Sequence, residues 1–295
     1  MDELQPLVCR YAELRHAWRD FLVDLALVLP NGEYFPDPFT KDASGVERLL
    51  RRVLGYAPLS SELEVRLGFL EEEESADGAR CGSGACGTGA KYSAHYNIFD
   101  EGDGYRVLLR PADLENATAL VCSLSRSAGA LVLAESGEEM REPVVDTEIA
   151  ATVCGYGALL TSGAAIYAKG CGGLRMHQAT ALSVSELAVL TALFARTHNE
   201  KTGRVRSHFG ATQQEAWDQA LAWVDSNRNL VQMLKDEPAA VASGMSEWNA
   251  TQGFFSRLFA RKEEPIPAPK TSNLTDEQRT RMLEARKLVD EALGE

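Results

Sequence analysis

Four cysteine and histidine residues have the chemistry to bind a soft metal ion. Cys81 and Cys86 are separated by four residues in a glycine-rich segment, and Cys171 and His177 form a second pair. Thiolate and imidazole groups are common zinc ligands in proteins. The gap between the first two cysteines is wider than the two residues of a usual zinc motif, so reduced loop thiols are the competing interpretation. Cys81 and Cys86 are also a candidate redox pair.

The same segment contains glycines and a lysine of the kind found in phosphate-binding loops. Residues 82–91, GSGACGTGAK, place a lysine after four glycines. The order Gly-Lys-Ser/Thr is missing, and the pattern predicts neither a buried strand before the segment nor a helix after it. We therefore interpret residues 71–91, an acidic run followed by these glycines, as a flexible loop.

The longest apolar segment, residues 111–133, predicts the helix around which the other elements are arranged. Pro111 suits the first turn of a helix, and Asp113 suits its positive end. Apolar or small side chains then recur every three or four residues, which keeps one helical face in a core. They are Leu114, Ala117, Val121, Leu124, Ala128 and Leu131. We expect a central helix from about residue 112, with Val121, Leu124 and Leu131 buried.

Hydrophobic periodicity predicts further helices around this segment. The expected helices cover residues 11–27, 44–55, 145–167, 185–197 and 211–225, with a short turn at 229–234. Ser44 is the expected N-cap of the second of these helices, and Ser183 with Glu186 predicts a capping box before the fourth. Cys122 and Cys154 fall on apolar helices and are expected in the core.

Alternating apolar and polar residues predict a small sheet. The expected strands cover residues 63–70, 92–99 and 105–109, whereas residues 28–39 and 169–182 are expected to be loops. The expected fold class is therefore α+β, a helical core with a small sheet.

The C-terminal part of the chain has a different composition. Residues 236–272 hold four prolines and isolated aromatic residues, which is typical of a linker. Residues 273–295 predict an amphipathic helix. The expected organisation is a domain over residues 1–235, a linker over 236–272 and a helical tail. The tail, residues 240–295, either docks on its own domain or binds a protein partner.

Composition and charge restrict the classes of partner. The net charge of −13 disfavours nucleic acid and anionic membranes. No apolar run approaches the roughly 18 residues of a membrane span, and the acidic, polar N-terminus is unlike a signal peptide. We expect a cytoplasmic protein with reduced cysteines, no cofactor, no nucleic-acid partner and no membrane contact.

Four segments between residues 10 and 230 carry a resemblance to a known family. They are LPNGEYFPDPF with the following VERLLRRVLGY, then YRVLLRPADLENATALVCSLSRSAGALVL, then DTEIAATVCGYGALLTSGAAIY, and last LSVSELAVLTALFAR. In this order they resemble a family of bacterial proteins of mostly uncharacterised role that carry a zincin-like HExxH domain. The resemblance implies a helical core of the zincin type, built around the segment that would hold HExxH.

The resemblance also implies that the metal motif has been lost. HExxH needs two neutral histidines one helical turn apart to bind zinc and a glutamate as general base. The five matching positions read Arg126, Ser127, Ala128, Gly129 and Ala130, and Glu148 stands at the position of a third ligand. Arginine stays protonated and alanine has no donor atom, so neither binds zinc. Ser127 as a nucleophile would need a base that the sequence does not supply.

These observations predict a pseudoenzyme, a non-catalytic metallopeptidase-like protein that acts by binding another protein. The alternative is an enzyme or a metal-binding protein that uses the loop with Cys81 and Cys86.

Overall fold

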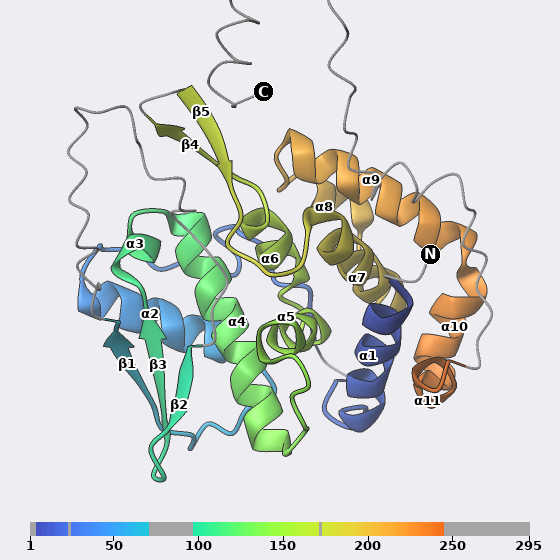
Figure 1. Ribbon diagram of the computed structural model, residues 1–295, viewed down its shortest axis with the longest axis horizontal. Coiled ribbons are helices and arrows are strands. Elements are labelled where there is room, and N and C mark those ends of the chain that lie inside the picture. The colour runs from blue at the N-terminus through green and yellow to red at the C-terminus, as the bar shows by residue number, and fades with distance from the viewer. Residues whose placement is uncertain (1–3, 23–24, 71–96, 171–172, 245–295) are drawn as a thin grey trace, which may run out of the picture. The chain divides into compact units, whose positions relative to one another are not determined.

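The computed structural model describes residues 4–22, 25–70, 97–170 and 173–244, and these form an α+β fold (Figure 1). All of them belong to the first of two structural units, Met1–Thr251. The expected α+β class is confirmed. The predicted tail helix, residues 273–295, lies outside the described residues.

The central apolar helix, α4, covers Ala117–Ser136. It begins later than the sequence predicted, because the side chain of Asn116 accepts hydrogen bonds from the backbone N–H groups of Thr118 and Ala119 and so caps a new helix. Residues Pro111–Leu114 form a separate short helix, α3. Leu124 and Leu131 are fully buried, as predicted, whereas Val121 is only half-buried.

The prediction of one continuous helix over residues 145–167 is wrong, because the structure has two helices there. Residues Pro143–Val153 form α5 and residues Gly157–Gly163 form α6. Gly155 lies between them with a φ of 93°, a left-handed conformation that ends α5 and that L side chains avoid. Its carbonyl accepts a hydrogen bond from the N–H of Val28, so the break is also fixed by a distant segment.

A three-stranded sheet flanks one end of α4 (Figure 1). Strands β1 (Val65–Phe69), β2 (Ile98–Asp100) and β3 (Tyr105–Leu109) have the order β1-β3-β2, with β3 parallel to β1 and antiparallel to β2. The predicted strands at 63–70 and 105–109 are confirmed. Of the strand predicted over 92–99, residues 92–96 lie outside the described residues. Val107 and Leu109 point into the core.

The loop expected over residues 169–182 is partly wrong, because a β-hairpin occupies its first half. Strands β4 (Ile166–Gly170) and β5 (Gly173–His177) pair antiparallel. Tyr167 and Met176 are paired across the two strands, and both side chains are about half exposed. The glycines in this segment favoured a loop, but backbone pairing across the hairpin satisfies the same N–H and C=O groups.

The remaining helices are α1 (Leu4–Ala17), α2 (Ala43–Leu54), α7 (Val184–Thr197), α8 (Thr202–Arg206), α9 (Ala211–Ser226), α10 (Arg228–Asp236) and α11 (Pro238–Ala242). Of these helices, α2 packs on α4, α1 and α7 pack on α5, and α8 to α11 lie farther out, with α9 and α10 on α7 and α11 on α1. The capping box of Ser183 and Glu186 is confirmed at the start of α7. The N-cap of α2 is Asp42, not Ser44, because the Asp42 carboxylate accepts the N–H of Gly45.

Two predicted boundaries differ from the structure. The helix expected over residues 11–27 begins at Leu4 and ends at Ala17, and the segment after it buries Trp18 without helical structure. Residues 238–242, assigned to a linker by their composition, form α11, which packs on α1 and buries Val241. Tertiary packing therefore extends the domain beyond residue 235.

Helix α4 is the one helix among the described residues that is long and apolar enough to cross a membrane. However, 78% of its most apolar window is buried inside the molecule. Core helices of soluble proteins pass the same test of length and composition, so this feature is weak evidence for a membrane span.

Candidate functional site

Helices α4 and α5 bring together the residues that the resemblance assigned to a lost metal site. The two helices approach closely at Gly129, where an added Cβ would lie 2.4 Å from the carbonyl oxygen of Thr147 and 2.5 Å from the nitrogen of Ala151. This contact places Arg126, one turn earlier on α4, beside Glu148 of α5. The position of Ala130 is filled by a buried methyl group.

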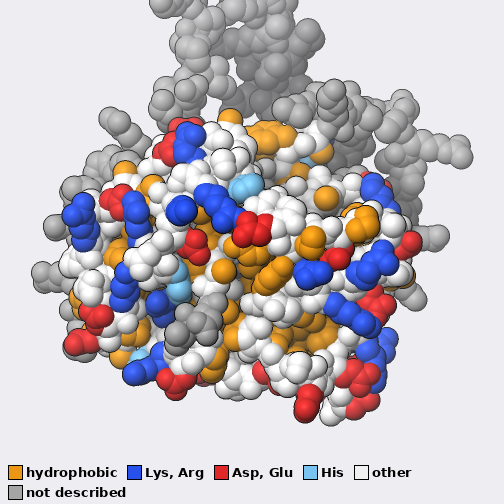
Figure 2. Space-filling model, turned by 180° about the vertical axis from the view of Figure 1, so that it is seen from behind, with side chains coloured by type: hydrophobic (Ala, Val, Ile, Leu, Met, Phe, Trp, Pro, Cys, Tyr) orange, Lys and Arg blue, Asp and Glu red, His pale blue; other side chains and the backbone are white. Residues whose placement is uncertain are grey.

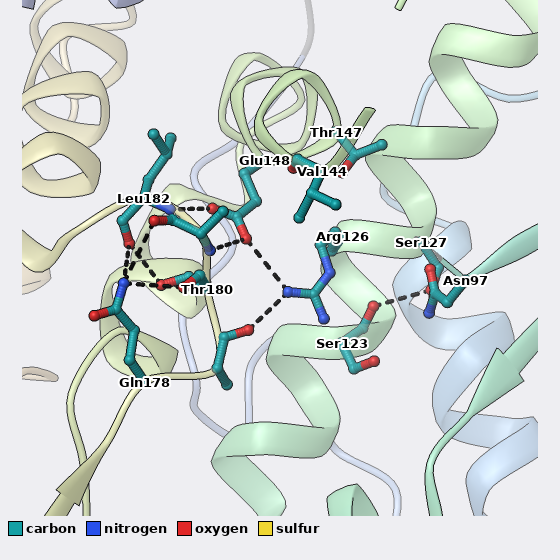
Figure 3. Close-up of polar contacts among 12 residues, drawn as sticks. Asn97, Ser123, Arg126, Ser127, Val144, Thr147, Glu148, Gln178, Thr180 and Leu182 are labelled. Atoms are coloured by element: carbon teal, nitrogen blue, oxygen red, sulfur yellow. Dashed lines mark hydrogen bonds and ion pairs between the residues drawn. The ribbon is translucent and has the colours of Figure 1, made fainter. Parts of the chain in front are cut away.

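Arg126 and Glu148 form a fully buried ion pair (Figure 3). The Arg126 Nη1 atom lies 3.3 Å from Glu148 Oε1 and donates a second hydrogen bond, of 2.7 Å, to the carbonyl oxygen of Ala179. Glu148 also accepts hydrogen bonds from the backbone N–H groups of Ala181 and Leu182, at 2.7 and 2.9 Å. The side chains of Arg126 and Glu148 are 1% and 0% exposed, so solvent does not reach either charge.

The electrostatic balance of this pair depends on its hydrogen bonds. Burial raises the pKa of the Glu148 carboxyl, while Arg126 and the two backbone N–H groups oppose this rise because they stabilise the carboxylate. A guanidinium group has no lone pair to offer a metal ion and only donates hydrogen bonds. The pair is therefore a cross-link between α4, α5 and residues 179–182, and it contains no group that can bind a metal ion at the Arg126 position.

Ser127 is held in a second buried network on α4 (Figure 3). Its hydroxyl donates to the carbonyl oxygen of Ser123 at 2.9 Å and accepts from Nδ2 of Asn97 at 2.7 Å. Among the described residues its hydrogen-bond partners are an amide N–H and a backbone carbonyl, and neither is a base that could activate it as a nucleophile. Sequence reasoning missed Asn97, because nothing in its local pattern connects it with α4.

The cysteine site predicted as an alternative lies mostly outside the described residues. Cys81, Cys86 and Cys171 are not described, and His177 lies at the end of β5, paired with Ile166 of β4. Within the described part of the chain, no three His, Cys, Asp or Glu side chains are close enough to hold a metal ion.

Cys122 and Cys154 are core residues, as the sequence predicted. Both are fully buried. Burial raises the pKa of the Cys122 thiol to about 12 and raises that of Cys154 as well, so both remain protonated. Cys122 packs on Gly163 of α6, where an added Cβ would lie 2.4 Å from its sulfur atom.

A cleft of about 770 Å³ lies near the N-terminal end of α4, apart from the ion pair. Its walls come from the aromatic loop 30–39, α2, α4, α6, β4 and residues 208–213. It combines apolar side chains such as Phe39 and Leu120 with polar groups such as Asn31 and His208, which contact each other at 3.3 Å. Neither Arg126 nor Glu148 lines it.

Figure 2 shows the face opposite to that of Figure 1, and on it exposed apolar side chains lie in hollows between charged side chains. The sequence predicted a loop over residues 28–39, which supplies one wall of the cleft, but not the cleft itself. The other walls come from segments that are distant in the sequence, so no local pattern could predict the cleft.

Comparisons of the chain with protein-family models, with characterised proteins and with solved structures find no match. The functional conclusion therefore rests on the residues and their geometry.

Proposed function

We propose that the protein is a non-catalytic metallopeptidase-like protein, a pseudoenzyme, which acts by binding another protein. The observation that supports this proposal is the Arg126–Glu148 ion pair. The arginine stands where the resemblance expects the first histidine, and it neutralises the carboxylate at the position of the third ligand. A permanently protonated guanidinium in that place repels a metal cation rather than binding it.

The cleft of about 770 Å³ is the proposed contact site for the partner. Binding sites of this size usually combine apolar walls with a few hydrogen-bonding groups, and this cleft has both. Phe39 on its rim is 41% exposed and so offers an aromatic anchor of the kind that dominates interface energetics. The tail, residues 240–295, is proposed as a second binding element through residues 245–295, which lie outside the described residues, because residues 240–242 belong to α11 and pack on α1.

Restoring the metal motif tests the pseudoenzyme proposal. The triple variant Arg126→His, Ser127→Glu and Ala130→His is expected to bind about one zinc ion per chain, because two histidines one turn apart would join Glu148, which already faces residue 126. Metal content after dialysis measures this, with circular dichroism to check folding. The matched control lacks only Ala130→His and is expected to lose most of the zinc.

The wild-type protein, treated in the same way, is expected to hold no zinc between α4 and α5. Stoichiometric zinc that persists after every cysteine has been replaced by serine would contradict the proposal. Zinc-dependent hydrolysis of an unfolded protein substrate by the wild type would contradict it as well.

Site-specific photo-crosslinking tests the proposed partner site. A photo-reactive phenylalanine analogue at Phe39 is expected to capture the same protein in repeated experiments in cells, because this side chain lies on the rim of the cleft. The matched control is the same analogue at Phe99, an aromatic side chain on β2 that is 49% exposed. Identical captured proteins at both positions would rule out the cleft as the specific contact.

A further inference from the structure

A second pocket, of about 380 Å³, lies where the C-terminal ends of α1, α7 and α10 meet. These three helices contact one another at this side of the molecule, and α11 packs beside α1 and α10 (Figure 1). The polar side chains that line it are Arg15, Arg19, Thr197, His198, Asn199 and Lys235. None of the described residues that line this pocket is acidic, although the whole chain has a net charge of −13.

Arg15, in the last turn of α1, is held in place but is not fully paired. Its Nε atom donates a 2.9 Å hydrogen bond to the carbonyl oxygen of Leu234 near the end of α10. Its Nη1 atom is buried and has no hydrogen-bond partner. The hydrogen bond to Leu234 caps the C-terminal end of α10, because it satisfies one of the last backbone carbonyls of that helix. The guanidinium also interacts with the buried hydroxyl of Tyr11 on the same helix as Arg15.

The other two cations also have unused hydrogen-bonding capacity. Lys235 Nζ donates to the side-chain oxygen of Asn199 at 3.2 Å, which orients that amide. Asn199 has a φ of 59° and is the one described residue other than glycine in the left-handed region. Arg19 is 70% exposed, and its one described ion-pair partner is Asp20, at 3.8 Å. Lys235 and Arg19 can therefore turn donors towards an acceptor in the pocket, which the guanidinium of Arg15 also lines.

The titration of His198 is consistent with a positive field in the pocket. Its ring stacks on Phe194 with 4.0 Å between the ring centroids. Burial lowers the pKa of His198 to about 4, and the charges of Arg15 and Lys235 contribute to this decrease.

We propose that this pocket binds a phosphate dianion carried by a small phosphate monoester. Two guanidinium groups and one ammonium group supply the donors that recognise phosphate oxygens, and the guanidinium fork matches their geometry. The volume accommodates a phosphate group with a small substituent. This site is independent of the cleft and of the proposed partner binding.

Titration of the full chain with inorganic phosphate, and in a second arm with phenyl phosphate, tests the proposal. NMR signals of the His198 ring are the readout, at constant ionic strength set with sodium chloride. Saturable binding is expected with both probes, tighter for the ester if the substituent adds contacts. Bound phosphate is also expected to raise the pKa of His198 above about 4, because the anion offsets the charges of Arg15 and Lys235.

The variants Lys235→Met and Arg19→Met are expected to weaken phosphate binding at least tenfold each. Both side chains lie at the surface, so these changes leave the fold intact. The matched control is Arg51→Met, an exposed arginine on α2 outside the pocket, which is expected to bind phosphate like the wild type. Absence of saturable binding, or equal affinity in the Lys235→Met and Arg51→Met variants, would overturn the proposal.

Discussion

Glu148→Leu is expected to lower the free energy of unfolding by about 3–5 kcal/mol, the usual cost of leaving one partner of a buried ion pair alone. The change leaves the Arg126 guanidinium charged and without its carboxylate in a site with no solvent access. It also removes the acceptor for the backbone N–H groups of Ala181 and Leu182. Urea unfolding followed by circular dichroism measures the loss.

The matched control is Glu47→Leu, which makes the same substitution in an exposed ion pair, that of Glu47 with Arg51 on α2. Exposed pairs contribute little, so this variant is expected to stay within about 0.5 kcal/mol of wild type. Equal losses for Glu148→Leu and Glu47→Leu would mean that the pair between α4 and α5 is solvated.

The double variant Arg126→Met with Glu148→Leu separates the charge from the hydrogen bonds. It is expected to recover part of the loss of Glu148→Leu, because the unpaired buried charge is gone. It should not return to wild-type stability, since Ala179, Ala181 and Leu182 keep backbone groups without partners. Non-additivity in this cycle would measure the coupling between the two side chains.

Gly129→Ala is expected to destabilise the protein by about 2–3 kcal/mol, in the range of overpacked cores. The new methyl group would meet backbone atoms of Thr147 and Ala151 on α5 at 2.4–2.5 Å, so the two helices would have to separate. This cost is expected even though alanine favours the helical state by about 1 kcal/mol relative to glycine. Thermal and urea unfolding provide the measurement.

Gly203→Ala is the matched control for this prediction. Gly203 lies in the short helix α8 and has no atom within 4 Å of an added Cβ. The substitution is therefore expected to be neutral or to stabilise by up to about 1 kcal/mol. If Gly129→Ala behaved in the same way, the close approach of α4 and α5 would not constrain the fold.

The Arg126–Glu148 pair, as observed, links the proposed loss of metal binding to the stability of the core. It ties α4 and α5 to residues 179–182, so a variant that restores histidines must also replace these contacts. Zinc in the triple variant would supply part of this cross-link through Glu148. For this reason, its stability with and without zinc is as informative as its metal content.

The sequence by itself determined the elements whose signals are local. The period of apolar residues predicted α4, α7 and α9, and the capping box placed the start of α7 at Ser183. Alternation predicted β1 and β3. These signals are sufficient because the hydrogen bonds of a helix and the two faces of a strand depend on residues close in sequence.

Helix breaks at Asn116 and Gly155 were not predicted, although both residues have the appropriate chemistry. An asparagine within an apolar helix pattern becomes a cap only if the chain before it turns away, as α3 does here. Gly155 ends α5 in a left-handed conformation, and a bond from the distant residue Val28 fixes it. The hairpin of β4 and β5 was missed for a similar reason, because strand pairing outweighed the loop preference of its glycines.

Only the tertiary structure decided which charged and polar groups meet. The resemblance assigned Arg126, Ser127, Ala130 and Glu148 to one expected site, but it did not show that Arg126 and Glu148 are paired and sealed from solvent. The cationic pocket joins Arg15, Asn199 and Lys235 from three helix ends, up to 220 residues apart in the numbering of the chain. Contacts of this kind depend on how helices pack, and packing is set by close approaches such as that at Gly129 rather than by any local pattern.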